Sequence, residues 1–294
     1  LSEKYDYRLA LSATPERYFD DEGTKKIREY FYGKKNFPEK DTYEFSLSDA
    51  ITKINPLTGK TYLVPYNYYM FYCPLTEEEY EKYNRFSISI RIAFEEAKKT
   101  KDYSDYKIRL RQRKDIIKGA RNKISTCDEI IRKIKKMDHG LFFLDNGKQI
   151  DKLTKMIEVN YPEKFTYKIF TSEKFKNPAS KQKFLNQFKE GKFQALLAID
   201  CFSEGLDVPC VEDAIFVASS TNPKEFVQRR GRVLRHYGNK KNANIYDVLV
   251  TSPEKNGSGV LFESEMKRAK VFIKDALNKR ECEMRLKKES EEIC

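Results

Sequence analysis

Short apolar runs alternate with amphipathic stretches through the second half of the chain. The runs are four to eight residues long, the length of buried strands, and occupy residues 140–144, 167–170, 193–199, 214–218 and 243–250. Helical stretches follow the turn at residues 145–147 and the capping residue Asn177. Strands that alternate with helices in this way predict an α/β fold, with a parallel sheet and helices on both of its faces.

A different pattern precedes these runs. Thr76 and Glu79 form a capping box, and apolar positions then recur every three or four residues as far as Ala97. After residues 101–103 a second helical stripe includes Ile117 and runs to Ile134. We expect an antiparallel helical hairpin whose two stripes pack on each other and fold separately. Its basic outer face is either solvated or in contact with a nucleic-acid backbone.

The two ends of the chain have weaker patterns. Residues 7–11 predict a strand, and Thr24 caps a short helix that runs to Tyr32. From Phe262 a long amphipathic helix is expected, with a charged, solvated tail at 279–294. Five segments follow: 1–33, an extended connector at 34–72 that includes the strand-like residues 62–71, the hairpin insertion at 73–137, the alternating domain at 138–252, and a C-terminal helix at 253–294.

The net charge of the chain favours some classes of binding partner over others. The 294 residues include 57 basic and 45 acidic side chains, for a net charge of +12. This excess favours polyanions such as nucleic acid, although a generally lysine-rich composition is an alternative explanation. No apolar run approaches about 20 residues, and no signal peptide is visible, so we expect no membrane partner. The six cysteines contain no CxxC pair, which predicts free thiols, no metal site and a cytoplasmic location.

The most informative motif is Gln228-Arg229-Arg230-Gly231-Arg232-Val233-Leu234-Arg235. Three of its arginines recur at three-residue spacing and would project from one side of a helix. A planar guanidinium suits phosphate recognition, although a solvated basic face is the ordinary reading of such a run.

Two other segments favour phosphate recognition over a solvated basic face. Upstream lie Leu196-Leu197-Ala198-Ile199-Asp200-Cys201-Phe202-Ser203-Glu204-Gly205-Leu206-Asp207-Val208-Pro209 and, near the start, Leu11-Ser12-Ala13-Thr14-Pro15. In chain order the three segments resemble motifs III, V and VI of superfamily 2 helicases, and they are most similar to the branch of DNA-repair translocases and type III restriction helicase subunits. The resemblance implies a RecA-like fold, with 138–252 as the second RecA-like domain and 1–33 as the remnant of the first.

The resemblance also implies roles for single residues. Arg232 and Arg235 would act as arginine fingers on the γ-phosphate of ATP, with Gln228 near the same phosphate. Gly205 would let the loop pass close to the nucleotide. Asp207 would bond a ribose hydroxyl or a motif VI arginine, and a buried ion pair is the structural alternative.

Further roles concern coupling and nucleic acid. The small hydroxyl side chains of Ser12 and Thr14 would couple the nucleotide state to motion. Backbone phosphates of nucleic acid, with double-stranded DNA as the favoured partner, would be contacted near Asn146, Thr171, Ser172 and Ser203. The family often has a threonine just before the motif V aspartate, where it contacts a backbone phosphate, and this chain has Ile199 at that position. Ser203 would make the phosphate contact in its place.

Two short matches are misleading. Gly59-Lys60-Thr61 lacks the earlier glycine of a phosphate-binding loop, since Ile54 stands there, and it predicts a hairpin turn. Asp128-Glu129 imitates an acidic box but lies inside a helical pattern. ATP and Mg²⁺ would therefore be held mainly by an upstream RecA-like domain, and this chain alone is expected to be inactive.

These features predict the C-terminal half of an ATP-dependent DNA helicase or translocase, in DNA repair or phage restriction. The alternatives are a non-enzymatic RecA-like module that binds nucleic acid, or half of an RNA helicase.

Overall fold

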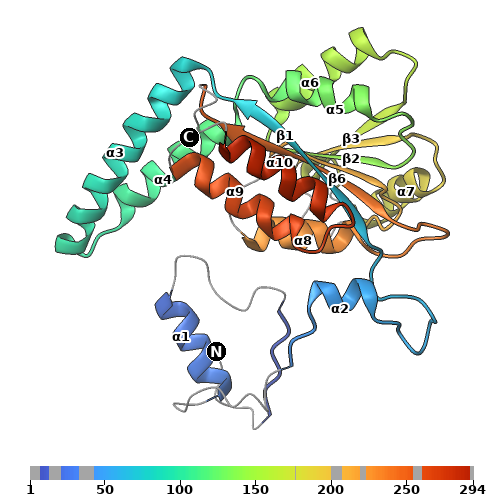
Figure 1. The fold of residues 1–294 in the computed structure, drawn as a ribbon, viewed down its shortest axis with the longest axis horizontal. Coiled ribbons are helices and arrows are strands. Elements are labelled where there is room, and N and C mark those ends of the chain that lie inside the picture. The colour runs from blue at the N-terminus through green and yellow to red at the C-terminus, as the bar shows by residue number, and fades with distance from the viewer. Residues whose placement is uncertain are drawn as a thin grey trace.

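A six-stranded parallel sheet forms the centre of the protein (Figure 1). The computed structural model describes residues 7–12, 21–32, 43–175, 177–199, 207–218, 223–253 and 260–291. The strand order is β1-β6-β5-β2-β4-β3, with bounds β1 Tyr66–Pro74, β2 Gly140–Leu144, β3 Tyr167–Thr171, β4 Ala195–Ile199, β5 Asp213–Phe216 and β6 Ala243–Thr251. The predicted α/β fold with a RecA-like parallel sheet is confirmed.

Helices cover both faces of this sheet (Figure 1). In chain order they are α1 Asp21–Tyr32, α2 Leu47–Thr52, α3 Glu77–Thr100, α4 Ser104–Lys118, α5 Lys123–Lys133, α6 Gly147–Asn160, α7 Pro178–Lys189, α8 Pro223–Val233, α9 Val260–Ile273 and α10 Lys279–Glu291. Helices α5 and α6 pack on one face, and α7, α8 and α9 pack on the other. Within the described ranges, no helix has both the length and the apolar character needed to cross a bilayer.

Alternation along the strands builds two hydrophobic cores. In β2, Leu141 and Phe143 face the core that contains α8 and α9, whereas Phe142 and Leu144 face the core that contains α5 and α6. All four side chains are nearly inaccessible to solvent. Because successive strand residues point to opposite faces, a continuous apolar run is what a sheet covered on both sides requires.

Local signals set the starts of several helices. Thr76 accepts a hydrogen bond from the backbone nitrogen of Glu79, and the Glu79 carboxylate accepts from the backbone nitrogen of Thr76, so the predicted capping box is present. Asn177 caps α7 by accepting from the Ala179 nitrogen at 2.8 Å, with Pro178 in the first turn. These contacts satisfy backbone groups that the first turn of a helix leaves unpaired.

The predicted second helix of the hairpin is two helices. Helix α4 ends before Gly119, and the chain turns before α5 begins at Lys123. Helices α3 and α4 pack side by side and project from the sheet (Figure 1), with Phe94 and Tyr106 in ring contact at 5.2 Å. Helix α5 instead packs against α6, β1 and β6. The expectation that the whole stripe to Ile134 pairs with the first helix was therefore wrong, because Ile131 and Ile134 belong to the core of the sheet.

Strand β1 joins the sheet from within the predicted connector. It pairs in parallel with β6 along its whole length, from Tyr66 opposite Ala243 to Pro74 opposite Thr251. Residues 7–11, by contrast, were predicted as a strand and are not one. Tyr7, Leu9 and Leu11 are more than four-fifths exposed, and the pairing recorded for the described residues gives them no neighbouring strand. A strand needs a partner for its backbone groups, which an apolar alternation alone cannot supply.

The C-terminal helix is also divided. Asn278, between α9 and α10, pairs with the edge strand: its side-chain oxygen accepts from the Tyr68 nitrogen, and its side-chain nitrogen donates to the Tyr68 oxygen, both at 2.9 Å. Cys282 and Leu286 of α10 are buried against the same core. The expected solvated tail is therefore in part a packed helix that covers the edge of β1, where unpaired backbone groups would otherwise face solvent.

Candidate nucleotide and nucleic-acid sites

Two of the four arginines in the motif hold α8 in place. Arg229 donates from Nη1 to the backbone oxygen of Ala218 at 2.7 Å, and its guanidinium lies 5.3 Å from the centre of the Phe143 ring. Arg230 is only 5% exposed and donates to the Tyr66 hydroxyl at 3.2 Å and to the Val271 oxygen at 2.9 Å. Arg229 therefore does not share an outer face with the other two arginines of the predicted stripe.

The remaining arginines are accessible. Gln228 and Arg232 are four residues apart on α8, which brings them to one side of the helix, and both are half-buried. Arg235 follows the end of the helix, and its Nη1 lies 2.6 Å from Oδ1 of Asp207. The two side chains of this pair are 50% and 54% exposed. Asp207 thus bonds a motif arginine, one of the two partners expected for it, and the buried ion pair is excluded.

Lys240 binds the backbone around this pair. Its Nζ donates to the backbone oxygens of Val233 at 2.5 Å, Pro209 at 3.1 Å and Arg235 at 3.5 Å. Burial lowers the pKa of Lys240 to about 8. The lysine therefore joins the segment that carries Asp207 to the end of α8. Sequence reasoning missed this residue, although a lysine shortly after a helix end often donates to the last carbonyl groups.

The turn at residues 54–61 lies against the same end of α8. Ile54 and Thr61 form an antiparallel bridge, and Gly59 has a φ of +66°, a conformation that favours glycine. The Thr61 hydroxyl donates to the Leu63 oxygen at 2.7 Å, so its oxygen is left to accept from Nε2 of His236 at 3.2 Å. The predicted hairpin turn is confirmed, and Lys60 belongs to no phosphate-binding loop.

Asp128, in the acidic pair of α5, also has a structural role. Asp128 is 7% exposed and accepts hydrogen bonds from Asn160 at 3.0 Å and Tyr161 at 2.8 Å, and it pairs with Arg132. Burial alone would raise the pKa of Asp128, but the hydrogen bonds from Arg132, Asn160 and Tyr161 outweigh it and lower the pKa. This side chain stabilises the packing of α5 on α6.

Three predicted nucleic-acid contacts gather at the carboxyl edge of the sheet. Asn146 follows β2 and caps α6, accepting from the Gln149 nitrogen at 3.0 Å. Thr171 ends β3, and Ser172 begins a 3₁₀ turn, Ser172–Phe175. Parallel strands bring these carboxyl ends to one edge. Helix α8 runs back from the carboxyl end of β5 towards the amino end of β6. Arg235 therefore lies near the edge of the sheet that the amino ends of the strands form.

The structure does not test the roles predicted for four other site residues. Thr14, Ser203 and Gly205 lie outside the described residues. Ser12 lies in the exposed segment 7–12, which contacts α1 through a hydrogen bond from Nη1 of Arg8 to the Tyr30 oxygen at 2.7 Å. The roles given to these four residues stay predictions.

Solved structures resemble this fold only distantly. The C-terminal part of the Fun30 ATPase domain has a TM-score of 0.45 at 14% identity, covering 64% of this chain and 86% of that one. The Hef helicase domain of Pyrococcus furiosus has a TM-score of 0.36 at 21% identity, covering 62% of this chain and 37% of that one.

Sequence comparison is more specific. DNA 3'-5' translocase XPB2 of Sulfurisphaera tokodaii is 24% identical over 246 residues, which covers 78% of this chain. The chain spans 50% of the length of that relative. The chloroplastic DEAD-box ATP-dependent RNA helicase 3B of Zea mays is 40% identical over 52 residues, 18% of this chain and 7% of that protein.

The family described as the helicase conserved C-terminal domain matches residues 122–237, which include α5, β2 to β5 and the arginine helix α8. Residues 122–237 of this chain therefore form a helicase conserved C-terminal domain.

Proposed function

We propose that this chain is the C-terminal half of an ATP-dependent DNA translocase or helicase that acts in DNA repair or phage restriction. The observation that carries the proposal is the pair between Arg235 and Asp207, 2.6 Å apart and half-exposed at the end of α8. A guanidinium that is oriented by a carboxylate, yet still open to solvent, fits an anionic phosphate presented by another domain.

In this proposal the chain supplies charge stabilisation. Arg232 and Arg235 approach the γ-phosphate, and Gln228 lies near the same group. Asp207 orients the Arg235 guanidinium, Lys240 holds the backbone of both segments, and Gly205 lets the loop pass close to the nucleotide. ATP would supply the phosphoryl group, and a bound Mg²⁺ would supply positive charge beside it. Both would be held mainly by an upstream RecA-like domain, since Lys60 lies in a hairpin turn and Asp128 is buried in α5.

Nucleic acid would bind at the other edge. Asn146, Thr171, Ser172 and Ser203 would face backbone phosphates, and Ser12 and Thr14 would couple the two sites. Contacts of this kind carry no sequence information, as a moving motor requires. Double-stranded DNA is the favoured partner, supported by the relative named as a DNA translocase. RNA is the second candidate, because the maize relative named as an RNA helicase matches 52 residues.

The test compares the 294-residue chain with a polypeptide in which an upstream RecA-like domain precedes it. We expect negligible ATPase activity from the chain alone and DNA-stimulated activity from the joined protein. Arg232→Ala or Arg235→Ala in the joined protein should lower turnover roughly 10³-fold with little change in ATP binding. Arg111→Ala, an exposed arginine on α4, is the matched control and should leave turnover unchanged.

Two results contradict the proposal. One is a joined enzyme that is indifferent to loss of both Arg232 and Arg235. The other is ATPase activity of the isolated chain that Lys60→Ala abolishes. Duplex RNA that stimulates turnover more strongly than duplex DNA would assign the protein to the RNA alternative.

A further inference from the structure

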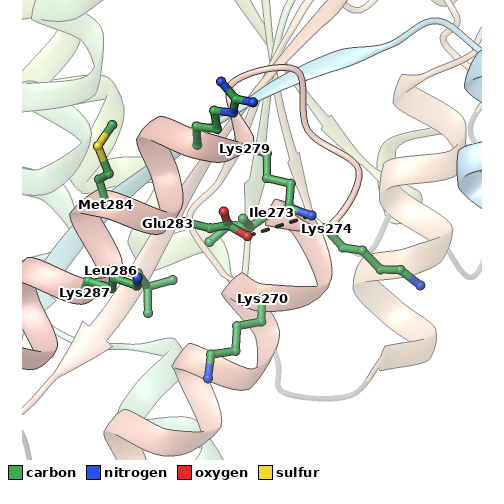
Figure 2. A pocket seen from close by; sticks show the side chains of 9 residues that line it. Lys270, Ile273, Lys274, Lys279, Glu283, Met284, Leu286 and Lys287 are labelled. Carbon is green, nitrogen blue, oxygen red and sulfur yellow. Dashed lines mark ion pairs between the residues drawn. The ribbon is translucent and has the colours of Figure 1, made fainter.

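A basic groove lies between the end of α9 and the start of α10, on the side of β1 (Figure 2). Its volume is about 1060 Å³. In the part of the chain that the structure describes, five cationic side chains and one carboxylate line it: Lys270, Lys274, Lys279, Arg280, Lys287 and Glu283. The carboxylate of Glu283 lies 3.9 Å from Nζ of Lys279, so the groove keeps a strong positive excess.

The groove also has an apolar part, and hydrogen bonds to β1 hold the turn between α9 and α10 in place. Ile273 and Leu286 are buried at its base, and Met284 is 66% exposed on its wall. Asn278 pairs with both backbone groups of Tyr68, and the Leu277 nitrogen donates to the Tyr66 oxygen at 2.8 Å. The turn between the two helices is thus bound to the edge strand, and the groove exists before any ligand arrives.

We propose that this groove binds an acidic, amphipathic helical segment of a partner protein. Carboxylates on the segment would face the lysines on the rim, and an aliphatic side chain would rest on Met284 above Ile273 and Leu286. Charge complementarity of this kind steers association and selects against basic partners. An amphipathic helix that lays its apolar side chains into a groove is a common mode of peptide recognition.

Two observations favour protein over nucleic acid as the occupant. Among the described residues, the lining contains no aromatic side chain on which a base could stack. The groove also flanks β1, which is the outermost strand on one side of the sheet, whereas Thr171 ends β3, the outermost strand on the other side. A nucleic acid held at the carboxyl ends of β2 and β3 would therefore not pass through the groove.

The groove lies directly behind the arginine helix. Phe272, next to Ile273, contacts Phe226 of α8 with ring centres 5.4 Å apart. Arg230 of α8 donates to the oxygen of Val271 at 2.9 Å. A partner in this groove would therefore rest on the same helix that supports α8. The binding itself needs only α9 and α10, whereas the choice of protein over nucleic acid rests in part on the nucleic-acid site proposed above.

The test is a binding assay with the 294-residue chain. The probe is a fluorescein-labelled helical peptide of about 16 residues, with glutamates around two central leucines. The variant replaces Lys270, Lys274 and Lys287 with glutamine, which removes three exposed charges. The control replaces Lys99, Lys135 and Lys192 with glutamine, an equal loss of charge at exposed sites away from the groove.

We expect the groove variant to bind the peptide about tenfold more weakly than the control variant. Met284→Ser should also weaken peptide binding without changing net charge, and a 20-base-pair DNA duplex should bind the groove and control variants equally. Unchanged thermal unfolding midpoints show that each variant is folded. Equal loss of peptide binding in groove and control variants, or no peptide binding at all, would overturn the proposal. Selective loss of DNA binding in the groove variant would assign the groove to nucleic acid instead.

Discussion

The Nζ atom of Lys240 lies 3.1 Å from the backbone oxygen of Pro209, two residues after Asp207. The same atom also donates to the backbone oxygens of Val233 and Arg235. One side chain thus connects the backbone on both sides of the pair between Asp207 and Arg235. We therefore expect the geometry of that pair to depend on Lys240, even though Lys240 contacts neither of its charged groups.

Replacement of Lys240 by methionine should affect activity more than stability. The change removes donors to three carbonyl groups, and it also removes the cost of burying an ammonium, so we expect the free energy of unfolding to change by less than about 1 kcal/mol. ATP turnover of the joined protein should fall roughly tenfold, because Arg235 loses its fixed position. Lys241→Met, at the exposed neighbouring position, should leave turnover unchanged. Equal turnover in the two variants would contradict the positioning role.

Arg230 and Arg232 should separate structure from activity. Arg230→Met leaves the Val271 oxygen and Tyr66 hydroxyl without their buried donor, so we expect a loss of about 2 to 4 kcal/mol in the free energy of unfolding. Arg232→Met, on the half-buried side of α8, should cost less than about 1 kcal/mol while lowering ATP turnover. Denaturant titration and turnover assays measure both effects. A similar loss of stability in both variants would show that Arg232 is also structural.

Lys123 should make stability depend on pH. It is 1% exposed, and burial lowers its pKa from 10.5 to about 8. Between these values the unfolded chain holds a proton that the folded protein has lost, so this group raises stability as pH increases. Lys123→Met removes the effect, and its stability relative to the native protein should fall by on the order of 3 kcal/mol from pH 7 to pH 10.5.

Denaturant unfolding at both pH values measures this difference. Cys73 and Cys127 interact electrostatically with Lys123, but burial raises their pKa values to about 11 and about 12, so both thiols stay largely protonated in the folded protein up to pH 10.5 and contribute little to the difference. Lys135→Met, at an exposed position in the chain segment that follows α5, serves as the control and should change stability equally at the two pH values. A constant difference for Lys123→Met would contradict the expected cost of its buried charge.

The outer part of the α3 and α4 pair should be dispensable. Nη1 of Arg113 lies 3.3 Å from the hydroxyl of Ser87, so a short glycine-serine linker can replace residues 88–112. The shortened protein should unfold cooperatively with a similar midpoint. Deletion of residues 76–136 would also remove α5, whose Cys127, Ile130 and Ile131 are fully buried, and should give an unfolded or insoluble product. A cooperatively folded protein after the longer deletion would contradict the place of α5 in the core.

Much of the fold could be predicted because its signals are local. The apolar run at β2, the capping box at Thr76 and the Asn177-Pro178 helix start each depend on a few neighbouring residues. The arginine motif likewise identified α8 and the pair between Arg235 and Asp207. These features need only strand alternation, unpaired backbone groups at helix starts and the charge of a guanidinium.

The tertiary structure decided what these elements contact. Ile131 has the same spacing as a hairpin stripe, but the turn after Gly119 directs it into the core beneath the sheet. Arg229 and Arg232 look alike in sequence, and only the position of Ala218 and Phe143 turns Arg229 inward. Lys240 carries no motif, and its role exists only because folding brings Pro209 beside the end of α8. Periodicity and propensity specify the faces of an element, whereas partners distant in the chain are fixed by packing and by the need to pair buried polar groups.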